Sequence, residues 1–368
     1  MKLINKSERL VSIDILRGFD MFFLVGATDI CRRFFDALGA DTLIHLERQF
    51  DHIQWEGFTA YDIIMPLFLF TSGLSMPFSF EKFFKQGKSK ANLYGKVLKR
   101  FCLLFLLGWI AQGHLLDLNI NTFHIYCNTL HAIAFGYLIT ALIILNVKKQ
   151  QIQLICGMSL VIIYWALMTF VSVPGFGSGI FTPEGNLAIY IDRIVIGRFV
   201  DGTQYTWILT SLGFGATVFS GYYAGLILKR SIDKHKKLKQ LLVVGIMLIV
   251  CGLLWSFQMP IIKKIWSCSM ILFSSGICFL LLALSFFLTD IKNYKGWWVT
   301  MFRIFGLNAI AAYMLHQTFA LDKLSAILLS GLEQFTGTYF PFCIALGEFA
   351  ILFGIIYHMY KYKIFLKV

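Results

Sequence analysis

Charged residues are scarce in this sequence. Only 14% of its 368 residues are charged, whereas 58% are hydrophobic and 16% are aromatic. Because about a quarter of the residues in a soluble domain are charged, this composition excludes an ordinary soluble domain. Apolar runs close to the roughly 20 residues that cross a bilayer recur along the chain. The sequence therefore predicts an all-helical integral membrane protein that crosses the bilayer many times.

Cysteine pairs and familiar catalytic motifs are also missing. The eight cysteines form no C-x-x-C pair and lie mostly in apolar runs, which favours small buried residues. No G-x-S-x-G, H-E-x-x-H or Walker A sequence occurs. His114, His124 and His131 lack the spacing of metal ligands, so no metal is expected. No cleavage site follows the polar, basic first ten residues, so no cleavable signal peptide is expected.

Positive charge is distributed unevenly between the loops. With the N-terminus in the cytoplasm, 23 Lys and Arg residues fall in inner loops and 8 in outer loops. The positive-inside rule then predicts both termini in the cytoplasm. The chain is predicted to form one domain, residues 1–368, whose outer loops 32–59 and 173–205 cap the outer face. The ten predicted spans are residues 11–31, 60–80, 98–114, 124–146, 152–172, 206–228, 241–258, 268–289, 299–320 and 340–360.

A titratable cluster borders the second apolar run. His52 lies close in sequence to Asp51, Glu56 and Asp62, any of which could orient or charge its imidazole. Ionisable groups beside a membrane segment are costly to keep unless they are used. Histidine is also the commonest general base for an amine or a hydroxyl. An interfacial histidine without a chemical role is the competing interpretation, and spacing alone does not decide between the two.

Other polar residues lie within or near the predicted spans. Asp14 and Arg17 are three residues apart on one helix face, which favours a structural ion pair. Asn308 in the ninth span either joins helices or lines a polar tunnel. Lys263 and Lys264 occupy an outer turn, against the general charge trend, which suggests a functional reason for their presence there.

Four motifs in a fixed order resemble a known family. They read RLVSIDILRGFDMFFLVGATD, HIQWEGFTAYDIIMPLFLFTSGLS, PIIKKIWSCSM and FGLNAIAAYMLH. Together they resemble the transmembrane acyltransferases typified by heparan-alpha-glucosaminide N-acetyltransferase, and especially their shorter bacterial relatives. The resemblance covers nearly the whole chain, and the bacterial relatives imply a bacterial inner membrane with the outer loops on its periplasmic face.

The resemblance implies a reaction and a catalytic residue. Family members pass an acetyl group from cytosolic acetyl-CoA across the membrane to the amino group of a terminal glucosamine. Their catalytic histidine lies in an H-x-x-W-x-G-x-T motif, matched here by His52, Trp55, Gly57 and Thr59. An assisting asparagine of the lysosomal enzyme corresponds to Thr28, beside Asp29. Glu56 replaces another asparagine of that enzyme, which leaves the acceptor open.

The site residues predicted from these arguments fall into three groups. They are His52, Asp29, Thr28 and Asp62 for catalysis, Trp55, Glu56, Asn308, His316 and Lys264 for the acceptor, and Lys99, Arg100, Lys229 and Arg230 for the acetyl-CoA phosphates. The expected partners are acetyl-CoA, a terminal glucosamine or related sugar, and the bilayer, with no nucleic acid. A homodimer stays open.

Two other functions remain under consideration. O-acetylation of a surface glycan differs only in the acceptor. A transporter or flippase for sugars or glycolipids would also need polar groups inside spans, such as Asp14, Asp20 and Asn308. Turnover of acetyl-CoA by the purified protein separates the transporter from both transferases.

Overall fold

Helices account for the regular structure of the described part of the protein. The computed structural model describes residues 10–39, 44–113, 115–116 and 119–366, so His114 lies outside the described residues. Within these ranges β-structure is limited to two isolated bridges, Glu56 with Ile262 and Val173 with Gly177. The predicted all-helical class is confirmed.

The helices follow one another along the whole described chain. The longer ones are α1 (Val11–Phe22), α2 (Thr28–Leu38), α4 (Ile64–Leu74), α5 (Met76–Lys85), α6 (Lys90–Gln112), α7 (Thr129–Asn146), α8 (Gln150–Phe170), α10 (Ser211–Lys229), α11 (Lys234–Trp255), α12 (Cys268–Phe286), α13 (Trp297–Leu307), α14 (Ala309–Thr318) and α17 (Phe340–Lys361). The shorter ones are η1 (Phe23–Ala27), α3 (Ile44–Glu47), η3 (Arg48–Phe50), η4 (Ala60–Ile63), α9 (Leu187–Val195), η5 (Gly197–Phe199), η6 (Phe287–Ile291), α15 (Leu321–Leu329), η7 (Ser330–Leu332), α16 (Glu333–Thr336) and η8 (Gly337–Tyr339).

Seven helical segments in the described part are long and apolar enough to cross a membrane. The bent pair α13 and α14, which changes direction by 73°, brings the number to eight if it counts as one span. The predicted spans 11–31 and 98–114 are helical in α1–α2 and α6. Their charged side chains keep them outside this set, because charge near the centre of a bilayer is costly. The number ten and the orientation of the termini stay predictions.

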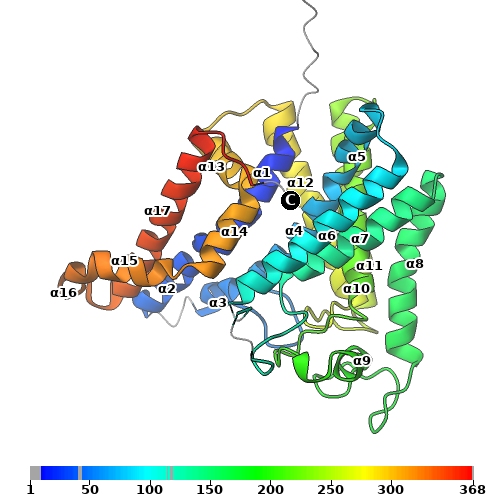
Figure 1. The fold of residues 1–368 in the computed structure, drawn as a ribbon, viewed down its shortest axis with the longest axis horizontal. Coiled ribbons are helices and arrows are strands. Elements are labelled where there is room, and N and C mark those ends of the chain that lie inside the picture. Colours follow the sequence, from blue (N-terminus) through cyan, green and yellow to red (C-terminus); the bar gives the residue numbers. More distant parts are fainter. Residues whose placement is uncertain (1–9, 40–43, 114, 117–118, 367–368) are drawn as a thin grey trace, which may run out of the picture.

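Close helix contacts depend on glycine at two crossings. A β-carbon on Gly18 of α1 would lie 1.6 Å from the backbone oxygen of Phe302 in α13. A β-carbon on Gly221 of α10 would lie 1.9 Å from the backbone oxygen of Phe70 in α4. Small residues let helix backbones approach each other in membranes. These crossings hold α1 against α13 and α4 against α10, as Figure 1 shows.

The two long loops lie at one end of the helices. Figure 1 shows α3 and α9, which belong to these loops, at the lower end of the view. The indole Nε1 of Trp55 donates a hydrogen bond of 2.9 Å to the backbone oxygen of Phe181 and so links them. Asp192 of α9 accepts backbone hydrogen bonds from Trp207 at 2.6 Å and Ile208 at 2.9 Å. Burial raises the pKa of Asp192 to about 6.

Candidate active site

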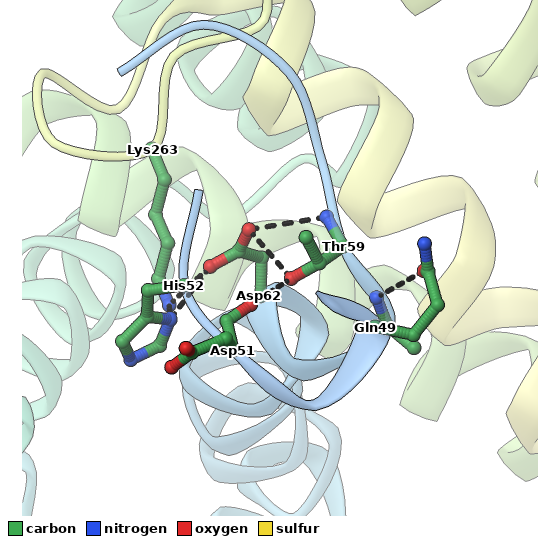
Figure 2. A network of polar contacts seen from close by, with 7 residues as sticks. Gln49, Asp51, His52, Thr59, Asp62 and Lys263 are labelled. Carbon is green, nitrogen blue, oxygen red and sulfur yellow. Dashed lines mark hydrogen bonds and ion pairs between the residues drawn. The ribbon is translucent and has the colours of Figure 1, made fainter. Parts of the chain in front are cut away.

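His52 is held by a buried carboxylate in η4, directly before α4. Its side chain is 46% exposed, and its Nδ1 atom lies 2.8 Å from Oδ1 of Asp62, whose side chain is 1% exposed. Oδ2 of Asp62 accepts hydrogen bonds from the backbone N–H of Thr59 at 3.1 Å and from its hydroxyl at 3.0 Å. Thr59 and Asp62 form a capping box, which fixes the carboxylate at the beginning of the helix. Figure 2 shows this network.

The second nitrogen of the imidazole is turned outward. In Figure 2, Nε2 of His52 points away from the carboxylate of Asp62. A proton on Nδ1, donated to Asp62, leaves a lone pair on Nε2, an assignment that rests on the hydrogen-bond partners. The ring of Tyr61 stacks on the imidazole, with centroids 4.5 Å apart, and fixes its plane. A histidine oriented by a buried carboxylate in this way can serve as a general base or as a nucleophile.

Lys263 completes the network from a distant part of the chain. Its Nζ atom lies 3.0 Å from Oδ1 of Asp62 and 3.2 Å from Nδ1 of His52, and its side chain is 6% exposed. Sequence reasoning selected its neighbour Lys264 instead, whose Nζ donates to Gln204 at 3.1 Å. The sequence did offer a signal for Lys263, because a lysine in an outer turn departs from the concentration of cations in the inner loops. This signal did not distinguish Lys263 from Lys264.

The turn that carries Lys263 is tied to the loop that carries His52. The backbone N–H of Gly57 donates to the backbone oxygen of Ile261 at 2.8 Å. Gly57 has a φ of +121°, which favours glycine. On the far side of the turn, Trp266 is buried and donates from Nε1 to the hydroxyl of Thr217 at 3.0 Å. The buried indole anchors the turn, so the position of Lys263 is set by packing as well as by charge.

Comparisons with known proteins identify the same region. The family model described as "Heparan-alpha-glucosaminide N-acetyltransferase, catalytic" matches residues 9–186, which include His52 and Asp62. The protein named heparan-alpha-glucosaminide N-acetyltransferase from Mus musculus is 24% identical over 333 residues, covering 73% of this chain and 49% of the mouse protein. Its Homo sapiens counterpart is 24% identical over 379 residues, covering 84% of this chain and 53% of the human protein.

The chain is similar to the heparan-alpha-glucosaminide N-acetyltransferases over these residues, and the predicted resemblance is thereby confirmed. The chain spans about half the length of the curated relatives it matches.

Two residues predicted to assist catalysis have other partners in the structure. The hydroxyl of Thr28, the first residue of α2, donates to the backbone oxygen of Phe23 in η1 at 2.9 Å. Asp29 forms ion pairs with Arg32 at 2.8 Å and Arg33 at 2.7 Å. In the described part of the chain neither residue is hydrogen-bonded to His52, and their catalytic roles stay predictions.

The residues predicted to bind the acceptor are spread over several places. Trp55 links the two long loops, and the backbone of Glu56 pairs with that of Ile262. Asn308 is fully buried at the bend between α13 and α14. His316 lies in α14, with its Nδ1 atom 3.3 Å from Oε1 of Glu348 in α17. Of this group, the structure brings only the 55–57 segment against the turn of Lys263.

A cavity of about 760 Å³ lies between the helices. Of the four residues predicted to bind phosphate, only Arg100 lines it, with its guanidinium 4.1 Å from the centre of the Tyr137 ring. Lys229 pairs with Glu81 at 2.7 Å, and Arg230 donates to Gln240 at 3.2 Å. Lys99 is exposed on α6. Sequence reasoning missed Arg303, Lys361 and Lys363, which line the cavity from α13 and the end of α17.

No group of three or more His, Cys, Asp or Glu side chains that could hold a metal ion is found in the part of the chain that the structure describes. The polar network at His52 contains one histidine, one buried carboxylate and one lysine ammonium. A histidine beside a buried carboxylate is capable of proton transfer or of acyl transfer.

Proposed function

We propose that this chain transfers the acetyl group of cytosolic acetyl-CoA to the amino group of a glucosamine-type sugar on the periplasmic side of a bacterial inner membrane. The observation that carries the proposal is the contact of 2.8 Å between Nδ1 of the half-exposed His52 and the buried Asp62. The relatives suggest the reaction type, because both are named as N-acetyltransferases of a glucosaminide.

The chemistry needs a base at the point where the amine attacks. An amino sugar must lose a proton before its nitrogen can attack a thioester carbonyl. In the proposed reaction the C–N bond forms, the C–S bond breaks, and Nε2 of His52 takes the proton of the amine and returns it to the leaving thiolate. Asp62 stabilises the imidazolium that forms. An acetyl-histidine intermediate uses the same geometry with Nε2 as the nucleophile, and both routes remain within the proposal.

The cavity has the charge pattern that a CoA donor requires. Its described lining contains five cationic residues and no acidic one; the cations are Arg17, Arg100, Arg303, Lys361 and Lys363. Its apolar lining includes Met21, Phe68 and Leu104. Arg and Lys side chains bind phosphate, while an apolar channel suits the less polar arm of the donor. We therefore assign the CoA phosphates to these cations, which α1, α6, α13 and the end of α17 supply.

Unsatisfied polar groups lie along and beside the cavity. Ser72 and Arg100 line it, and the buried hydroxyl of Ser72 and the buried Nε of Arg100 have no hydrogen-bond partner within the described structure. Both polar atoms of the Asn308 side chain are buried without a partner, between Gly306–Leu307 and Ala309–Ile310, which also line it. Buried polar groups without partners are costly, and each calls for an explanation. The two amide groups of the pantetheine arm offer a donor and an acceptor of the kind that Asn308 lacks.

Helix α4 joins the proposed donor and acceptor sites. Asp62, in η4 directly before it, orients His52, and Ser72, ten residues after Asp62, lines the cavity. Ten helical residues span roughly 15 Å. The acetyl end of a donor bound in the cavity must cover this distance to reach the imidazole, which agrees with a long, thin arm rather than with a compact substrate.

The test is turnover by the purified full-length protein in detergent, with acetyl-CoA labelled in the acetyl group and glucosamine as acceptor. We expect label in N-acetylglucosamine and release of free CoA. Label in an O-acetyl ester, which mild base removes, would mean that the acceptor group is a hydroxyl and not an amine. If protein that binds acetyl-CoA shows no transfer and no hydrolysis, the proposal is overturned and transport is favoured.

A further inference from the structure

The network around His52 contains more charge than a base and its orienting carboxylate require. Lys263 is buried, and its Nζ atom lies within hydrogen-bond distance of both Nδ1 of His52 and Oδ1 of Asp62. Burying a lysine is costly unless the ammonium is paired, and here it shares one carboxylate oxygen with the histidine. Nothing in the acyl-transfer chemistry described above uses this lysine.

The three polar atoms form a small triangle. Nδ1 of His52 to Oδ1 of Asp62 is 2.8 Å, Nζ of Lys263 to the same Oδ1 is 3.0 Å, and Nζ to Nδ1 is 3.2 Å. Nδ1 donates its proton to Oδ1 of Asp62, as described above, so the ammonium and the ring meet at the shared carboxylate oxygen rather than through a hydrogen bond to each other. A doubly protonated imidazole would therefore place a second cation 3.2 Å from the first, with one carboxylate between them. Like charges at this distance disfavour the protonated ring.

The other charged and titratable groups near His52 do not remove the repulsion between the Lys263 ammonium and a protonated imidazole. Its own loop contributes Asp51 and Glu56, both exposed. From η4, Tyr61 stacks on the ring. Tyr205 lies close enough for Asp62 and Tyr61 to act on it electrostatically. Asp29 and Arg32 of α2, which form an ion pair, act on Tyr61 in the same way. Lys263 is the buried cation among these groups.

We propose that Lys263 is a positioning residue that keeps the imidazole of His52 neutral by sharing the Asp62 carboxylate. The proposal rests on the function assigned to His52 above, since a base or nucleophile must be unprotonated to act. Burial lowers the pKa of Lys263 from its usual range, and the Asp62 carboxylate opposes that change. Without Lys263, Asp62 would have the imidazolium as its only cationic partner.

The test measures the protonation of His52 without any substrate. Diethyl pyrocarbonate acylates neutral imidazole, and mass spectrometry of the His52 peptide gives the rate as a function of pH. Lys263→Met should move the midpoint of this curve to higher pH by at least about one unit, because a cation beside the ring has been removed. Lys263→Arg keeps the charge and should stay near the wild type. Lys264→Met, one residue along, is the matched control and should leave the curve unchanged.

A second pair of variants covers the case in which Lys263→Met does not fold. Lys263→Gln should produce the same upward shift. Asp62→Asn removes the carboxylate but keeps the lysine, so it should move the midpoint to lower pH. An unchanged or lowered midpoint in a folded Lys263→Met or Lys263→Gln protein overturns the proposal, as does an upward shift in Asp62→Asn.

The readout also separates this proposal from the proposed function. If the midpoint shifts as expected but no variant or wild-type protein transfers acetyl groups, the charge relation holds and the function assigned to the site is wrong. If transfer occurs and the midpoint does not depend on Lys263, the function stands and the role of the lysine is refuted.

Discussion

Replacing His52 by alanine should separate activity from stability, because the contacts of its ring are few. The imidazole makes one hydrogen bond to Asp62, while that carboxylate keeps Lys263 and both donors of Thr59. Losing one hydrogen bond without stranding a buried charge costs about 1 kcal/mol of unfolding free energy. The side chain is also 46% exposed, so the cavity left behind is small. We therefore expect His52→Ala to fold.

The same change should remove most of the transfer activity. General-base catalysis contributes about 10²–10⁴-fold, and loss of an acetyl-carrying nucleophile costs at least as much. The assay is transfer of labelled acetyl from acetyl-CoA to glucosamine, with binding of acetyl-CoA measured separately. We expect at least about a hundredfold loss in kcat with donor affinity kept. If donor hydrolysis disappears together with transfer, the histidine carries the acetyl group.

His235→Ala is the matched control, because this histidine is exposed at the start of α11. It should keep wild-type activity. A folded His52→Ala protein with near-normal transfer would refute the assignment, whatever the outcome for the control. The search would then turn to Asp29, Asp62 and His316.

Other predictions address the donor cavity, the outer loop and the topology. Arg303→Ala and Asn308→Leu should raise KM for acetyl-CoA more than they lower kcat, because they remove binding shared by ground and transition states; unchanged KM in both would place the donor elsewhere. The pKa of Asp192 is raised to about 6, so its contribution to stability is fully present below about pH 4 and is lost as pH rises through 6. Thermal unfolding should therefore occur at a lower temperature at pH 7 than at pH 5, and Asp192→Asn should weaken that difference; equal dependence in both proteins would contradict it. Reporter fusions after Gly87 should report cytoplasm and fusions near Gly179 periplasm, and the reverse pattern would put His52 on the wrong side for the mechanism.

Local pattern was enough to predict the helices and part of the site. Apolar runs of bilayer length form helices because backbone polar groups in lipid must be satisfied within the segment. Eight of the predicted spans therefore correspond to apolar segments of the structure, counting the bent pair as one. The H-x-x-W-x-G-x-T motif selected His52, and the T-x-x-D spacing of Thr59 and Asp62 was a capping box open to recognition. Both signals lie within a dozen residues of chain.

The tertiary structure alone decided which distant residues meet. Lys263 is 211 residues from His52 along the chain, and nothing in its immediate sequence distinguishes it from Lys264. The packing of Trp266 and the backbone bond from Gly57 to Ile261 turn one lysine inward and leave the other near Gln204. Long-range contacts of this kind depend on how the elements pack, which local periodicity does not encode.

The dependence on packing also explains why most residues predicted to bind the CoA phosphates do not line the cavity. Counting cations at the ends of spans selected Lys99, Arg100, Lys229 and Arg230, because the positive-inside rule places many lysines and arginines at that face. Only the helix arrangement shows which of them border a cavity and which are paired elsewhere, as Lys229 is with Glu81. The sequence by itself determined the membrane class and the helices, and it selected His52 as the candidate catalytic residue. The packing of α1, α4, α6, α13 and α17 determined the cavity, and the outer turn determined the partner of the histidine.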